Sequence, residues 1–169
     1  MSTAVIGFDL TRVYTSVSPS GSGEQSPRLG QVYIDGQGNR YRFVKNLHSS
    51  TLAVGDVVFY DYTNGVSYEV ARLGTGISGL DAMAGAAMGT IATNGFGWIQ
   101  IAGDGTALVH GGTAVTIGDS LKGSNAQLYV IKDADIGTAP AHHNHMRVRV
   151  DYSTASGALK AVTINCHSW

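Results

Sequence analysis

The feature that most constrains this chain is the regular recurrence of short strand-like runs separated by turn-forming residues. From residue 30 onward, such runs occur at 31–35, 40–44, 57–62, 66–73, 98–102, 128–131, 146–152 and 159–164. Glycine accounts for 23 of the 169 residues, which suits tight turns and works against long helices. This spacing is typical of sandwiches and barrels. We therefore expect a mainly β fold, a single β-sandwich or barrel-like domain with an extended N-terminal arm.

The clearest predicted hairpin spans residues 31–44, with its turn at the Gly-Gln-Gly-Asn sequence of residues 36–39. In its second strand, Tyr41 and Phe43 alternate with arginines at positions 40 and 42. A period of two is expected when one face of a strand is buried and the other is in water. The pattern therefore predicts a half-buried strand whose arginines point outward.

Residues 1–29 differ in composition from the β domain at 30–169. After a short apolar start, the stretch 16–29 is dominated by Ser, Gly and Pro. Such a composition buries little apolar area and describes a flexible or extended arm. Two interpretations remain open, a disordered terminus and an arm that becomes ordered on a neighbouring subunit. In the second case, the partner-binding residues are Val5, Ile6, Phe8, Leu10, Pro19 and Pro27.

One internal similarity stands out. Residues 50–58 resemble residues 113–121, because both run from apolar residues into a Gly-Asp pair and then into a new apolar pair. The similarity predicts two turns that each deliver the chain into a strand. Either two similar turns arose in a turn-rich protein, or part of the chain is duplicated.

Charge and hydropathy exclude several classes of protein. The net charge is −1 and the basic residues are scattered, whereas nucleic-acid binders concentrate basic charge on one face. No apolar run approaches the roughly 18 residues of a membrane span. The start of the chain lacks a basic, apolar signal sequence. We expect a protein made in a cytoplasm-like compartment, with no nucleic-acid or membrane partner.

Two motifs invite a chemical interpretation. Residues 74–79 fit the G-x-G-x-x-G pattern, and residues 80–89 could form the short helix that follows it in nucleotide folds. No strand–helix alternation surrounds them, so a glycine-rich loop between strands is the better interpretation. In His142-His-Asn-His145, His143 and His145 would share one side of a strand and could share a cation. Solvated or interface histidines, which could make assembly pH-sensitive, are favoured over a built metal site.

No catalytic arrangement is recognisable elsewhere in the chain. The G-x-S-x-G motif is absent, and the acidic residues mostly occupy turn contexts, where they bond their own backbone. The single cysteine, Cys166, excludes an internal disulfide and is expected to pack in the last strand. We expect no enzyme activity, no cofactor and no metal.

The stretch 84–103, with its Gly95-Phe-Gly-Trp98 core, and its sequel to Leu121 resemble a segment of the head decoration (cement) proteins of tailed bacteriophages. The shared pattern is a small apolar strand, a Gly-aromatic-Gly-Trp turn, an alternating strand, a loop and a Gly-Asp return. In this pattern Phe96 and Trp98 anchor the hairpin, while Gly95 and Gly97 supply positions of positive φ. The segment covers less than a quarter of the chain.

The resemblance implies a protein that binds the major capsid protein on the outer surface of an assembled phage head, commonly as a homotrimer, and stabilises the shell. Its location would be the exterior of the capsid, after synthesis in the host cytoplasm. The alternatives are another virion or adhesive β module, such as a tail component or a carbohydrate-binding domain, and a small enzyme or metal protein that uses the histidine cluster.

Overall fold

The computed structural model describes residues 9–14, 27–61, 68–71, 83–110, 114–124, 127–132, 146–149 and 157–166. These residues form strands and no helix, which confirms the mainly β prediction. In chain order the strands are β1 (Val32–Ile34), β2 (Arg40–Asn46), β3 (Val57–Tyr60), β4 (Glu69–Ala71), β5 (Met83–Ala87), β6 (Phe96–Val109), β7 (Ser120–Gly123), β8 (Val130–Lys132), β9 (Met146–Val148) and β10 (Ala158–Asn165). Within this described part, no helix is long and apolar enough to cross a membrane.

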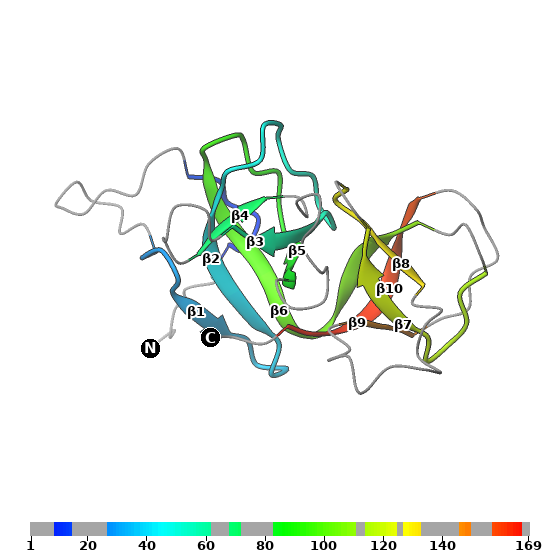
Figure 1. The fold of residues 1–169 in the computed structure, drawn as a ribbon. Coiled ribbons are helices and arrows are strands. Elements are labelled where there is room, and N and C mark those ends of the chain that lie inside the picture. The colour runs from blue at the N-terminus through cyan, green and yellow to red at the C-terminus, as the bar shows by residue number, and fades with distance from the viewer. Residues whose placement is uncertain are drawn as a thin grey trace, which may run out of the picture.

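The strands form two closed five-stranded rings that share β6, whose two halves lie in different parts of the molecule (Figure 1). Ring one runs in the order β2, β4, β3, β5 and the first half of β6, and closes where β2 pairs with β6. Ring two runs in the order β6, β8, β7, β9 and β10, and closes where β10 pairs with the second half of β6. The pairs β2–β4 and β6–β8 are parallel and the others antiparallel. Strand β1 lies outside ring one, on β2.

The two rings have the same topology. We number the five strands of each ring from one to five in chain order. Around each ring, the strands then follow one another in the order one, three, two, four, five. Strand β3 begins at Val57 and its counterpart β7 at Ser120, 63 residues later. Strand β5 begins at Met83 and its counterpart β9 at Met146, again 63 residues later. The similarity between residues 50–58 and 113–121 is therefore part of a duplication of the whole ring.

The turn that precedes the second strand of each ring has the same backbone structure. In ring one, the Asp56 N–H donates to the Ala53 carbonyl (3.1 Å), and the Ala53 N–H donates to the Asp56 carboxylate (2.7 Å). Gly55 has φ 83°, a value that side chains disfavour. The residues 63 positions later make the same two bonds, at 3.0 and 2.7 Å, around Gly118 at φ 86°.

Apolar side chains fill both rings and the space between them. One cluster occupies the interior of ring one and includes Val58, Ile99 and Ile101. A second cluster fills ring two and continues onto the outer surface of ring one, where it includes Val57 and Phe59 of β3. The two rings are thus joined by a common core as well as by β6.

Two local predictions were wrong. Strand β2 is buried on both faces, not on one, because one face points into ring one and an aromatic cluster covers the other; Arg42 is 4% exposed. Within residues 80–89, for which a glycine-rich loop was preferred over a short helix, Met83–Ala87 form strand β5. Its residues are small because β6 lies close by, and a Cβ at Gly85 would overlap the Gln100 carbonyl oxygen.

Candidate interaction surface

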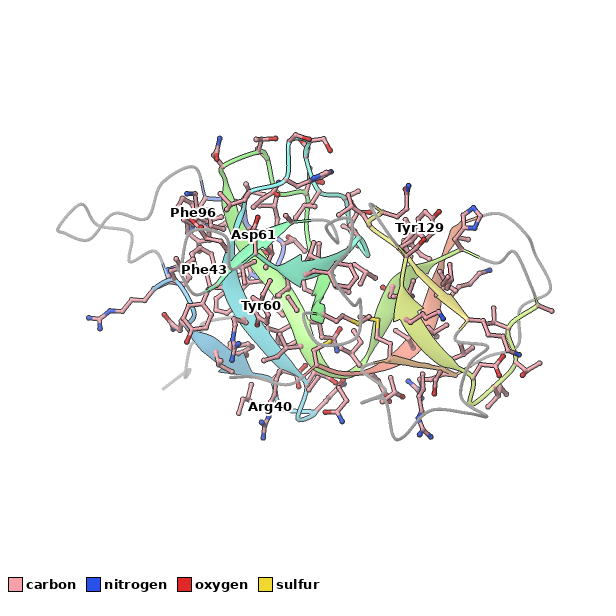
Figure 2. All side chains as sticks on the ribbon, in the orientation of Figure 1. Arg40, Phe43, Tyr60, Asp61, Phe96 and Tyr129 are labelled. Carbon is pink, nitrogen blue, oxygen red and sulfur yellow. The ribbon has the colours of Figure 1, made fainter. Side chains whose placement is uncertain are left out.

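An aromatic cluster covers the outer face of ring one, between β2 and β6. Phe43 and Trp98 are fully buried, with ring centroids 5.3 Å apart. Tyr33 of β1 packs on Trp98 at 6.4 Å, and Tyr14 packs edge-on against Phe43 at 5.3 Å. Figure 2 shows Phe43 and Phe96 together on this side of ring one. The members of the aromatic cluster are Tyr14, Tyr33, Tyr41, Phe43, Phe96 and Trp98.

The predicted anchor residues Phe96 and Trp98 both belong to this cluster, Trp98 fully buried and Phe96 partly buried. The predicted positive φ at Gly95 and Gly97 was wrong, because the turn places it at Asn94 (φ 60°). Both glycines instead lie in closely packed positions. A Cβ would lie 2.9 Å from the Ala92 carbonyl oxygen at position 95, and 2.7 Å from the Ile91 side chain at position 97.

The described part of the predicted arm, residues 9–14, lies on its own chain. Tyr14 and Phe96 exchange two backbone hydrogen bonds of 3.0 and 2.8 Å, and Leu10 packs against the aromatic cluster. Pro27 is also buried. The other four predicted partner-binding residues, Val5, Ile6, Phe8 and Pro19, lie outside the described residues. A role of the arm in partner binding stays a prediction.

Among the described strands, β1 pairs with β2 alone, so its other edge has no strand partner there. Tyr33 faces the aromatic cluster, whereas Val32 and Ile34 on the opposite face are 42% and 55% exposed. The backbone bonds that flank the strand, from the Phe43 N–H to Gln31 and from the Asp35 N–H to Asn39, set the alternation of an antiparallel pair. By this alternation, the N–H and C=O groups of residues 32 and 34 point away from β2. Val32, Ile34 and these backbone groups are the β1 edge.

The turn after β1 is held firmly. The Asp35 carboxylate accepts hydrogen bonds from the backbone and side chain of Asn39 (2.9 and 2.8 Å), from the Gln37 N–H (2.8 Å) and from the Tyr41 hydroxyl (3.0 Å). The bond from the Asn39 side chain is the main cause that lowers the pKa of Asp35. Burial, and next the bond to Asp35, raise the pKa of Tyr41 to about 12. The Asn39 amide oxygen also accepts from the Asp104 N–H (3.0 Å), which ties this turn to the middle of β6.

Ring one also contains a buried cation. The Arg42 Nη1 donates to the Tyr60 hydroxyl at 2.7 Å, and the guanidinium lies 5.1 Å from the centroid of the Tyr68 ring. Its buried Nε has no hydrogen-bond partner. Tyr68 has φ 73°, which is strained for a bulky residue. Arg42 was predicted to point outward, so this arrangement was not expected. No local sequence pattern indicates the contacts of Arg42 with Tyr60 and Tyr68.

Several predicted features lie outside the described residues, namely the G-x-G-x-x-G stretch at 74–79 and the histidine cluster His142–His145. Among the residues that are described, no group of three or more histidine, cysteine or acidic side chains could hold a metal ion. Cys166 is buried, and burial raises the pKa of its thiol. Among the described residues, the β1 edge is therefore the candidate interaction surface.

No family model matches the sequence, and no curated protein matches it either. Among solved structures, the chain is similar to the N base of the head fiber gp8.5 in bacteriophage phi29. The sequence identity is 11%, the TM-score is 0.47, and the match covers 74% of this chain and 92% of that chain. A likeness at this level assigns neither a family nor a function to the chain.

Proposed function

We propose that this chain is a structural protein of a bacteriophage head, which attaches to the outer surface of the assembled capsid through the major capsid protein and stabilises it. One observation carries the proposal. Residues 84–121, which resemble head decoration proteins, include most of β5, the start of β7 and all of β6, the strand that both rings share. The resemblance therefore concerns the central scaffold and not a peripheral loop.

Attachment of this kind needs a rigid body and several modest contacts. A protein that binds only the assembled lattice stabilises it by mass action, by about 2.7 kcal/mol per site at a concentration a hundredfold above its dissociation constant. A homotrimer would link three such contacts and raise the effective affinity without new chemistry. In this proposal the apolar residues Val5, Ile6 and Phe8 contact the capsid, because they precede the segment that packs on its own ring.

The positions of the aromatic side chains favour this function over carbohydrate binding. Sugar-binding modules present exposed aromatic rings, whereas in the described part of this chain the exposed large hydrophobic residues are all aliphatic. Phe43 and Trp98 are buried in the aromatic cluster. The proposed role also requires no catalysis, so metal analysis and substrate screens of the purified protein should find neither a bound metal nor turnover.

Co-sedimentation with phage heads tests the proposal. The protein should pellet with expanded heads and stay in the supernatant with unexpanded ones. Deletion of residues 1–8 should lower occupancy, because it removes Val5, Ile6 and Phe8 but keeps residues 9–14, which cover ring one. The matched control Val54→Asp changes an exposed residue on a different surface (46% exposed) and should bind like the wild type. Failure of the intact protein to pellet with any head would refute the proposal.

A further inference from the structure

The duplication allows each surface of ring two to be compared with its counterpart in ring one. The turn before β3 is covered by the other ring of its own chain. The Gly55 carbonyl accepts a hydrogen bond of 2.7 Å from the Leu108 N–H on β6. The Leu159 side chain on β10 lies so close to Gly55 that a Cβ there would overlap it. This turn therefore docks on a strand pair that supplies an aliphatic side chain and a backbone N–H.

In the described part of the chain no atom covers Gly118 of the counterpart turn before β7, although the backbone of the turn is the same. A Cβ at Gly118 would meet no atom within 4 Å. The neighbouring Ile117 is 65% exposed, more than any other large hydrophobic residue in the described part of the chain. We call Ile117 and Gly118 the open turn. The covered turn of ring one indicates what chemistry fits it, namely an aliphatic side chain and a free backbone N–H on a strand.

The chain itself carries a strand with these properties. The β1 edge offers the exposed aliphatic side chains of Val32 and Ile34, together with backbone N–H groups that point away from β2. Figure 1 shows β1 and β7 at opposite ends of the molecule, so the β1 edge does not cover the open turn of its own chain. A second copy brings the two surfaces together without moving any element.

We propose that the open turn of one copy docks on the β1 edge of a second copy. The Gly118 carbonyl then accepts from an outward N–H of β1, and Ile34 packs against the glycine as Leu159 packs against Gly55. The contact is heterologous, because it joins two different surfaces, and heterologous contacts build rings or chains and not two-fold dimers. It would supply the homo-oligomer of the proposed function, but it forms in solution without a capsid.

Sedimentation velocity over a concentration series tests this interface with two variants. Gly118→Asn keeps the fold, since asparagine tolerates positive φ, but places a side chain where the aliphatic group would dock. Ile34→Asp places a charge on the β1 edge. Each variant should raise the dissociation constant for self-association by about tenfold or more. Val54→Asp, at the position in ring one that matches Ile117, should associate like the wild type. Circular dichroism and thermal melts establish that every variant is folded.

A mixture of the two variants gives the sharpest result. Gly118→Asn retains an intact β1 edge and Ile34→Asp retains an intact open turn, so the mixture should form a heterodimer although each variant alone is monomeric. A monomeric wild type at its highest soluble concentration would overturn the proposal, as would a mixture that stays monomeric. If the wild type is monomeric but both variants lower binding to heads, the capsid occupies these surfaces, and the second-copy interface is wrong while the proposed function stands.

Discussion

Replacing Asp56 and Asp119 by asparagine, one at a time, applies the same change to the two copies of the repeated turn. The surroundings of the two carboxylates differ. Asp56 is 8% exposed, and burial is the main cause that raises its pKa. Asp119 accepts a hydrogen bond from Lys132 Nζ at 2.8 Å, which is the main cause that lowers its pKa, and two more from Thr116. The two substitutions should therefore have unequal effects on stability.

The expected magnitudes follow from the bonds that each substitution weakens. Asparagine keeps one acceptor oxygen at both positions, so the bond to the turn backbone survives in each variant. Asp119→Asn loses a partly exposed ion pair, worth about 0.5–1 kcal/mol, and weakens two charge-assisted bonds by roughly 0.5 kcal/mol each. The total loss is about 1.5–2 kcal/mol. Asp56→Asn weakens one such bond but removes a charge that burial disfavours, so its net effect should lie within about 0.5 kcal/mol.

Urea unfolding followed by tryptophan fluorescence measures both effects, and acid distinguishes their causes. A lowered pKa at Asp119 contributes stability that is present above the ordinary value of 3.8 and lost as the pH falls through the folded value. The penalty of Asp119→Asn should therefore shrink in acid. A raised pKa at Asp56 contributes stability only at low pH, so Asp56→Asn should compare better with the wild type at neutral pH than in acid. An equal loss from both variants at neutral pH would refute this reasoning.

Three further predictions concern the stability of ring one. Arg42→Met should leave the free energy of unfolding unchanged or raise it by about 1–2 kcal/mol, because it removes a buried guanidinium whose Nε is unpaired; a large loss in urea unfolding would contradict this. Asn46→Ala should cost about 3 kcal/mol in the same assay, since the buried amide donates to the Ser50, Ile91 and Ala92 carbonyls (2.9–3.2 Å). Because the pKa of Tyr41 is raised from 10.0 to about 12, stability should fall as the pH rises between these values, and Tyr41→Phe should reduce that fall in alkaline unfolding curves.

The strands were predictable where a local pattern was enough. The predicted runs at 31–35 and 40–44 correspond to β1 and β2, and the last run at 159–164 lies within β10. The full length of β6 was not predictable, because its second half begins with the breaker-like sequence Gly103-Asp-Gly105. The first glycine has φ 100° and abuts Asn39, and the second abuts Gln100. Gly103 thus serves a contact with a residue that is distant in sequence, which no local pattern records, whereas Gly105 packs against Gln100 of the same strand.

The same limit applies to the candidate surface. The alternation in β2 correctly placed Phe43 in the core but wrongly placed Arg42 in water, because a period of two assumes that one face of a strand is solvated. Arg42 instead faces the interior of ring one, where it donates to the Tyr60 hydroxyl, while the N-terminal segment and β1 cover the opposite face of β2 through the aromatic cluster. In the sequence, the open turn is recognisable because residues 113–121 resemble residues 50–58. Its exposure became apparent only when the structure showed that its counterpart at Gly55 is covered.

The sharing of β6 leads to a final prediction about folding. Removing ring one from ring two would break β6 at its middle and expose Val57 and Phe59 of β3, which belong to the core of ring two. Neither ring can therefore unfold alone without a large loss of buried apolar surface, so the chain should unfold in one cooperative transition. Trp98 fluorescence in a Trp169→Phe background reports on ring one, where Trp98 is fully buried.

Cys166 reports on the ring-two core, since it is buried there and its N–H donates to Ile101 at 2.8 Å. Burial raises the pKa of the thiol and shields it, so a thiol reagent should react only with unfolded chains. The urea midpoints from Trp98 fluorescence and from Cys166 labelling should coincide. If labelling of Cys166 begins at clearly lower urea than the loss of Trp98 fluorescence, ring two opens while ring one stays folded, and a shared strand does not suffice to couple two duplicated rings.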